Sequence, residues 1–152
     1  MPTNAIVRVL LGCLLTIFAT ACSSPEQEAH EHVARAVNFP LLMLKPAVAK
    51  LFALKSDDHV GIIEACMSAD DQLDVLRRVR FDDEHIDQFD HTSRVSALPS
   101  YAEEMLLFER SSFCLERPLD SCSSWCLRTW GWLVDVVERI RQDARKHGVE
   151  IV

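Results

Sequence analysis

Glycine is scarce in this 152-residue chain, and its scarcity excludes several kinds of site. Beyond residue 21 it occurs only at Gly61, Gly131 and Gly148. A glycine-rich phosphate loop and the G-x-S-x-G elbow of serine hydrolases both need closely spaced glycines, so neither can form. The sequence also lacks the H-E-x-x-H of zinc proteases and the C-x-x-C of redox centres and zinc ribbons. No motif indicates an enzyme or a cofactor, and we expect neither.

Positive charge is also in short supply, since 16 Lys and Arg residues face 23 Asp and Glu residues for a net charge of −7. This balance does not suit a nucleic-acid partner. The deficit is uneven along the chain. Residues 82–109 are rich in acids, with Arg94 as the only Lys or Arg, whereas residues 33–55 contain no acid. We therefore expect one acidic end and one basic, apolar end.

Apolar residues recur at spacings of three and four rather than two, which predicts an all-α fold. Capping patterns at Ser56, Ser68 and Ser100 predict helix starts, because each side chain can satisfy a backbone N–H of the first turn. The helices expected from these starts cover residues 57–67, 69–81 and 101–115.

The last helix has the clearest pattern. It should begin near Ser121 and end at Gly148, a residue that takes the left-handed conformation at low cost. A helix opening at Pro46 and a short one around His32 would complete a compact bundle of five to seven helices over residues 29–152. The core stripe of the last helix is expected to contain Cys126, Leu133, Val137, Ile140 and Ala144.

Residues 9–21 form an apolar run that follows Arg8 and ends in the small residues Ala19 and Ala21. The run is shorter than the roughly 20 apolar residues that span a bilayer. A basic start, a short apolar middle and a small-residue end are the three parts of a secretory signal peptide. We therefore expect residues 1–21 to be removed. Without a lipid anchor, the product would be a soluble periplasmic or secreted protein.

Cys22, directly after the cleavage site, resembles the last position of the lipobox of bacterial lipoproteins, although Ala19 stands where that family usually has Leu. The resemblance covers residues 1–22 and implies that Cys22 becomes the acylated first residue. Ser23 in the next position implies the outer membrane. Residues 22–28 would then be the lipidated end and a polar tether.

Cysteine parity supports acylation of Cys22. Cys13 leaves with the signal and an acylated Cys22 cannot pair, so the mature chain keeps four cysteines that can pair completely in an oxidising compartment. These four are Cys66, Cys114, Cys122 and Cys126.

Cys122 and Cys126 lie four residues apart on the expected last helix, where a bridge between them would strain disulfide geometry. The turn before that helix folds Cys114 back along it, which predicts a bridge from Cys114 to one of the two. Cys66 takes the partner that remains, and the sequence leaves that choice open. We expect both bridges to be structural.

Residues 82–91, DDEHIDQFDH, gather five acids and two histidines. Carboxylates and imidazoles are ligands for divalent cations, but the pattern matches no known metal loop. We interpret the stretch as a solvated surface. Partner binding by Asp83, Asp87 and Asp90 is the first alternative, and a metal on Asp87 and His91 is the weaker second.

Three tryptophans fall within eight residues of the expected last helix. Trp125 and Trp132 are seven residues apart and share a face, whereas Trp130 points elsewhere. We expect the pair to pack in the core and Trp130 to be exposed, because tryptophan is a frequent anchor of protein interfaces.

Residues 39–55, FPLLMLKPAVAKLFALK, combine apolar side chains with spaced lysines. Such a segment fits either a buried helix whose lysines extend to solvent or a helix in the headgroup layer of a membrane. Pro40, Pro46 and the short length favour the buried helix.

These features predict an outer-membrane lipoprotein whose helical periplasmic domain binds another protein. The chain is similar in size, anchor and helix content to the pilotin lipoproteins that escort secretin subunits, which implies an envelope-assembly partner. An immunity protein that neutralises a periplasmic toxin is the alternative. A metal binder or enzyme using residues 82–91 is the third possibility.

Overall fold

A computed structural model of the protein describes residues 24–81, 92–105 and 114–152. Within these residues the chain is helical, as predicted, and contains no strand. Among the described residues, four helices have eight residues or more and one has five, which is slightly fewer full helices than the five to seven expected. They are α2 (Pro25–Ala53), α3 (His59–Arg77), α5 (Thr92–Ser96), α6 (Leu98–Met105) and α8 (Leu119–Lys146).

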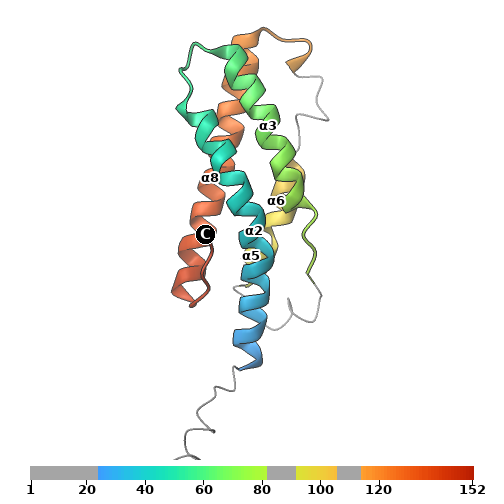
Figure 1. Ribbon diagram of the computed structural model, residues 1–152, viewed down its shortest axis with the longest axis vertical. Helices are drawn as coiled ribbons and strands as arrows, with labels where there is room; N and C mark the ends of the chain where they lie inside the picture. The colour runs from blue at the N-terminus through green and yellow to red at the C-terminus, as the bar shows by residue number, and fades with distance from the viewer. Residues whose placement is uncertain (1–23, 82–91, 106–113) are drawn as a thin grey trace, which may run out of the picture.

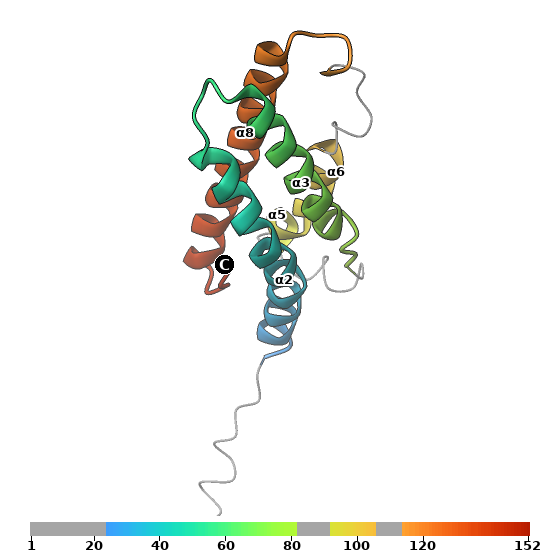
Figure 2. The same cartoon turned by 45° about the horizontal axis from the view of Figure 1, so that its top comes forward.

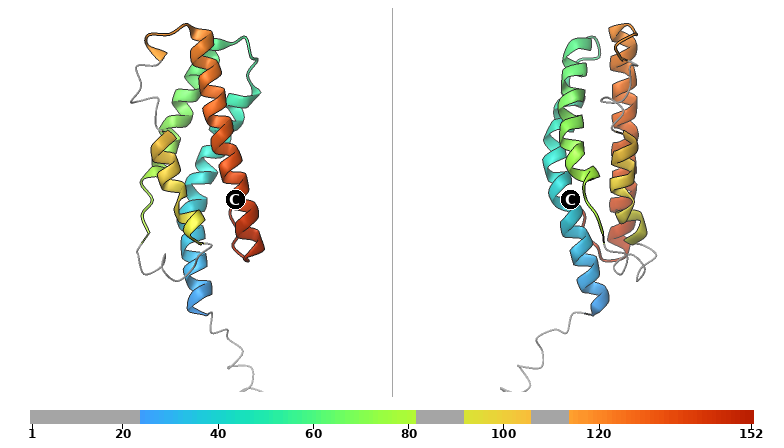
Figure 3. Two further views of the ribbon diagram at one scale, coloured as in Figure 1. Left: turned by 180° about the vertical axis from the view of Figure 1, so that it is seen from behind. Right: turned by 90° about the vertical axis from the view of Figure 1, so that its right-hand side faces the viewer.

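The helices form two layers. α2 and α3 lie antiparallel in one layer, and α5, α6 and α8 form the other (Figures 1 and 3). In Figure 2, α8 runs behind α3 and α2. The start of α2 and the end of α8 lie towards the same end of the molecule.

The core lies between the layers, and each long helix contributes one apolar stripe to it. Among its buried members are Val33, Val37, Leu41 and Leu44 of α2, Ile62, Ala65, Ala69 and Leu73 of α3, and Trp130, Leu133, Val136 and Ile140 of α8.

α2 is one continuous helix that contains both Pro40 and Pro46. The predictions of a short helix around His32 and of a separate helix from Pro46 are therefore wrong. Each internal proline removes a backbone hydrogen bond and costs about 3 kcal/mol or more. Burial of α2 side chains on both sides of the prolines offsets this cost, because each fully buried aliphatic side chain contributes about 1.5–3 kcal/mol.

α2 also begins earlier than expected. Pro25 occupies its first turn, and the Ser24 hydroxyl accepts a hydrogen bond from the N–H of Gln27 at 3.2 Å. The tether expected over residues 22–28 is therefore helical from Pro25 onwards. Its polar residues serve as helix-start signals, and the acids of the first turn complement the helix dipole.

α3 starts close to the predicted position, with Asp58 as its cap: Asp58 Oδ1 accepts a hydrogen bond from the N–H of Gly61 at 3.0 Å. The break predicted at Ser68 is wrong, since α3 continues through it. The buried stripe runs unbroken past this point through Cys66 and Ala69, and its packing outweighs the local capping option.

α6 begins at Leu98, slightly before the expected start, and the rest of the helix predicted at 101–115 lies largely outside the described residues. α8 also starts two residues before Ser121 and ends at Lys146. Gly148 then takes a φ of 76°, which confirms its predicted role in ending the helix.

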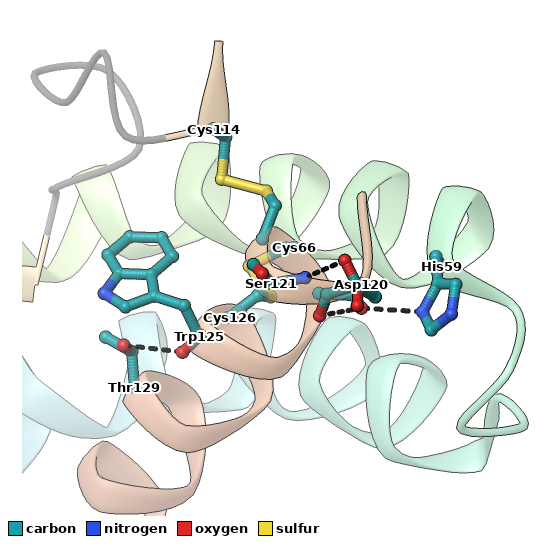
Figure 4. The surroundings of a disulfide bond; sticks show 10 residues. His59, Cys66, Cys114, Asp120, Ser121, Trp125, Cys126 and Thr129 are labelled. Atoms are coloured by element: carbon teal, nitrogen blue, oxygen red, sulfur yellow. Dashed lines mark hydrogen bonds between the residues drawn. A yellow bond between two sulfur atoms is a disulfide. The ribbon is translucent and has the colours of Figure 1, made fainter. Parts of the chain in front are cut away.

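Two disulfides staple the fold, as predicted, and the structure decides between the alternative pairings. Cys66 of α3 pairs with Cys126 of α8 at a Cα–Cα distance of 6.4 Å. Cys114 pairs with Cys122, closing the turn before α8 at a Cα–Cα distance of 5.2 Å. Figure 4 shows both bridges near the start of α8.

Candidate functional site

An apolar groove of about 220 Å³ lies between α2 and α8, and we call it the α2–α8 groove. Aliphatic and aromatic side chains from both helices form most of its walls. The α2 wall consists of Leu41, Leu44 and Val48, and the α8 wall of Trp130, Leu133, Val134 and Val137. Lys45, Glu138, Arg141 and Val152 complete the lining.

The groove follows from the way the helices pack. α8 packs chiefly along α3, to which the Cys66–Cys126 bridge ties it, and α2 packs along α3 as well. α2 and α8 therefore touch each other little. The gap between them has rigid helical walls, which suits a preformed binding surface.

The segment after α8 closes one end of the groove. Val149 and Ile151 are buried, and Asn38 of α2 holds the segment in place. The Asn38 side chain donates to the carbonyl of Glu150 at 3.0 Å and accepts from the N–H of Val152 at 2.9 Å. These two bonds fix Val152 in the groove lining.

Three charged side chains, Lys45, Glu138 and Arg141, form the rim of the groove. Hydrogen bonds from Gln142 and then from Arg141 hold the pKa of Glu138 below its usual value of 4.5, so its carboxylate stays ionised. Arg141 reaches Glu138 Oε2 at 2.5 Å and also donates to the carbonyl of Val152. Its buried Nε finds no hydrogen-bond partner among the described residues. Lys45 forms no ion pair with any described carboxylate.

The prediction that Trp130 is the exposed tryptophan is wrong. Its side chain is 3% exposed and forms part of the groove wall, whereas Trp132 is 41% exposed and meets Tyr101 edge to face. The spacing from Cys126 could have shown this, because Trp130 follows that core cysteine by four residues and precedes Leu133 by three. Trp130 can therefore contact a partner only as the wall of the groove.

A second surface is the side of α2 that faces away from the core, which we call the α2 outer face. Spacings of three and four place its exposed apolar side chains in one stripe. They belong to Phe39, Leu42, Met43, Pro46, Ala49 and Ala53. The sequence of residues 39–55 already contains this spacing. The prediction of a buried helix explains the side of α2 that packs on α3, but it does not explain the apolar side chains of the α2 outer face.

α2 is the one helix of the described ranges that is long and apolar enough to cross a membrane, judged by length and composition. Only 28% of its qualifying 18-residue window is buried inside the bundle. Its core face packs along α3, so lipid cannot surround the helix while the bundle is folded.

A serine and a histidine also meet near the disulfides. His59 Nδ1 lies 2.8 Å from the Ser123 hydroxyl, which donates to the carbonyl of Asp120 at 3.0 Å. Figure 4 labels His59 and Asp120 on either side of this contact. This pair resembles a nucleophile and its base, but Ser123 is buried and no substrate could reach it in this arrangement. The contact instead ties α3 to the first turns of α8.

Several predicted site residues fall outside the described ranges. These are the lipidation candidate Cys22 and the acidic-stretch residues Asp83, Asp87, Asp90 and His91. Within residues 24–81, 92–105 and 114–152, no group of three His, Cys, Asp or Glu side chains is placed to hold a metal ion.

No family model, curated protein or solved structure matches the chain. The function must therefore be argued from the groove, the charges and the surfaces described above.

Proposed function

We propose that the protein is an outer-membrane lipoprotein, acylated at Cys22, whose periplasmic domain binds an apolar helix of another protein in the α2–α8 groove. The observation that carries this proposal is the groove itself, with its two helical walls and its apolar lining. Helix-in-groove recognition is a common way for an apolar groove to bind a peptide segment.

The size of the groove favours protein side chains over a small molecule. Sites for small ligands usually measure about 300–1,000 Å³, and this groove is smaller, at about 220 Å³. A volume of this size suits the few apolar side chains that a partner helix presents on one face. Trp130 is 3% exposed, so it forms part of the wall but offers a partner little contact area.

The rim specifies the charge of the partner. Lys45 is exposed and unpaired among the described residues, whereas Arg141 already pairs with Glu138. A carboxylate next to the apolar residues of the partner helix would pair with the Lys45 ammonium group. The expected partner segment is therefore an amphipathic helix with an acidic residue at its edge.

The disulfides support a location outside the cytoplasm, and the start of α2 is compatible with an anchor at Cys22. Both cysteine pairs of the described chain are oxidised to disulfides, which persist in oxidising compartments. α2 starts at Pro25, so the bundle would begin three residues after an acylated Cys22. An envelope-assembly partner and a periplasmic toxin are the two candidates for the bound protein.

A matched pair of variants tests the groove. Val134 lines it on the α8 side and is exposed, and Val60 of α3 is exposed outside it. Tagged lipoprotein carrying Val134→Arg or Val60→Arg would be crosslinked in its native cells, extracted from the membrane and analysed by quantitative mass spectrometry. We expect Val134→Arg to lose at least about tenfold of one specific partner, equal to about 1.4 kcal/mol, and Val60→Arg to retain it.

The same experiment reports on the anchor, because the intact mass of the bait shows whether Cys22 carries acyl groups. Equal partner recovery from the two valine variants would contradict the groove proposal. An unmodified Cys22 in a soluble bait would contradict the anchor without affecting the groove result.

A further inference from the structure

The α2 outer face is unusual for a helix that covers a water-soluble bundle. Such helices normally present charged and polar side chains to solvent. Here Phe39 is 63% exposed, Leu42 51% and Met43 46%, and the stripe continues through Pro46 to Ala53. The carboxyl-terminal half of α2 is therefore apolar on the face that meets water as well as on the face that meets α3.

The charges within residues 33–55 of this face all have one sign, although Arg35 pairs with Glu31 just before the segment. Residues 33–55 contain no acid in a chain whose net charge is −7. Lys50 lies within the stripe, between Pro46 and Ala53 in sequence and on the same side of the helix. The basic residues of the segment are Arg35, Lys45, Lys50 and Lys55, and all four are exposed.

This composition fits a lipid surface better than a protein surface. Protein interfaces favour Phe and Met as well as Tyr, Trp and Arg, so the apolar residues of this face fit either surface, but interfaces are depleted of lysine. Helices that lie in the headgroup layer instead combine Phe and Leu with lysines, whose aliphatic stems cover apolar surface while their ammonium groups reach phosphate.

The packing of α2 against α3 also limits the orientation in which the helix can contact a bilayer. The core face stays against α3, so α2 can lie along a bilayer but cannot cross it as a folded bundle. The groove residues Leu44 and Val48 lie on a different side of α2 from Phe39 and Met43, since helical spacing separates them by more than a quarter turn. Lys45 of the groove rim lies between the two surfaces, three residues after Leu42. Lipid contact therefore leaves the apolar walls of the groove open.

We propose that the α2 outer face docks onto the surface of an anionic phospholipid bilayer. Phe39, Leu42 and Met43 enter the boundary between headgroups and acyl chains, and Lys50 contacts lipid phosphate. This contact adds a second attachment to the proposed acyl anchor. It would hold the bundle with α2 parallel to the membrane.

The test uses the mature chain from residue 22 with Cys22→Ser, which removes any acyl contribution and keeps every described residue. Flotation would be measured with vesicles of phosphatidylethanolamine and phosphatidylglycerol, and with vesicles of phosphatidylcholine alone. We expect binding to the anionic vesicles that weakens with added salt, and at least tenfold weaker binding to the neutral ones.

Two double variants separate this face from exposed apolar surface in general. Leu42→Glu with Met43→Glu changes the α2 outer face, and Val60→Glu with Met67→Glu changes side chains of α3 that are similarly exposed, at 54% and 53%. We expect the first to lose vesicle binding at least tenfold and the second to keep it, with circular dichroism confirming that both fold. Lys50→Gln should weaken binding to the anionic vesicles only.

A photo-crosslinker at position 42 in native cells completes the test. Three results would overturn the proposal: no flotation of the parent, equal losses of vesicle binding in the two double variants, or a crosslink from position 42 to another protein when the parent binds no vesicles. The vesicles contain no partner protein, and Val134 is untouched. A failure here is therefore distinguishable from a failure of the groove proposal.

Discussion

The two disulfides should differ in their contribution to stability, because they close loops of very different length. Cys66 and Cys126 are 60 residues apart in sequence, whereas Cys114 and Cys122 are 8 apart. Cross-linking removes chain entropy from the unfolded state and removes more of it for longer loops. The chain-entropy relation gives about 4.3 kcal/mol for the long loop and about 2.5 kcal/mol for the short one.

Packing adds to the difference. Cys66 and Cys126 are both buried in the core, so replacing them with alanine also removes buried sulfur atoms. A domain of this size has a free energy of unfolding of about 5–15 kcal/mol, so the loss of the long-range bridge takes a large share of it.

The assay compares Cys66→Ala with Cys126→Ala against Cys114→Ala with Cys122→Ala. Urea unfolding followed by circular dichroism gives the free energy of unfolding for each pair and for the parent. We expect the loss from the first pair to exceed the loss from the second by about 2 kcal/mol or more. Equal losses, or a greater loss from the second pair, would refute the argument from loop length.

Substitutions on α8 and at its end give further expectations, each measured as a change in the free energy of urea unfolding. Trp130→Ala should cost about 3–5 kcal/mol because the ring is buried, whereas Trp132→Ala should cost at most about 1.5 kcal/mol, from its contact with the ring of Tyr101; similar losses would contradict the burial of Trp130. Gly131→Ala should stabilise the protein by about 0.5–1 kcal/mol, since a helical Cβ there meets no atom within 4 Å. Gly148→Ala should instead destabilise it by about 1 kcal/mol, because φ is positive there, and a gain in stability would contradict that backbone conformation.

Local signals predicted the helical class and the ends of α8 well. These signals are the scarcity of glycine, the apolar spacing and Gly148 at the end of α8. Each depends on residues close in sequence, so it could be interpreted without knowing the tertiary packing. Both disulfides were predicted from the sequence, except for the choice between Cys122 and Cys126 as the partner of Cys114. The structure settles it through the turn before α8, which places Cys114 beside Cys122 and leaves Cys126 facing Cys66 of α3.

The errors come from packing between distant segments. Ser68 and Pro46 are local stop or start signals, and both lie inside helices whose buried stripes continue past them. The α2–α8 groove could not be predicted, because it depends on both helices packing on α3 and on Asn38 holding the segment after α8. The error at Trp130 is of a different kind, because its spacing from Cys126 and Leu133 already placed it on the predicted core stripe.

The proposed partner helix binds in the α2–α8 groove, and a photo-crosslinker placed at position 134 probes that contact. Position 60 on α3, at a similarly exposed valine outside the groove, is the control. We expect an adduct from position 134 in native cells, none from position 60, and a crosslinked peptide that maps to an amphipathic helix with an acidic residue at its edge. An adduct from position 60 without one from position 134, or equal adducts from both, would contradict binding in the groove.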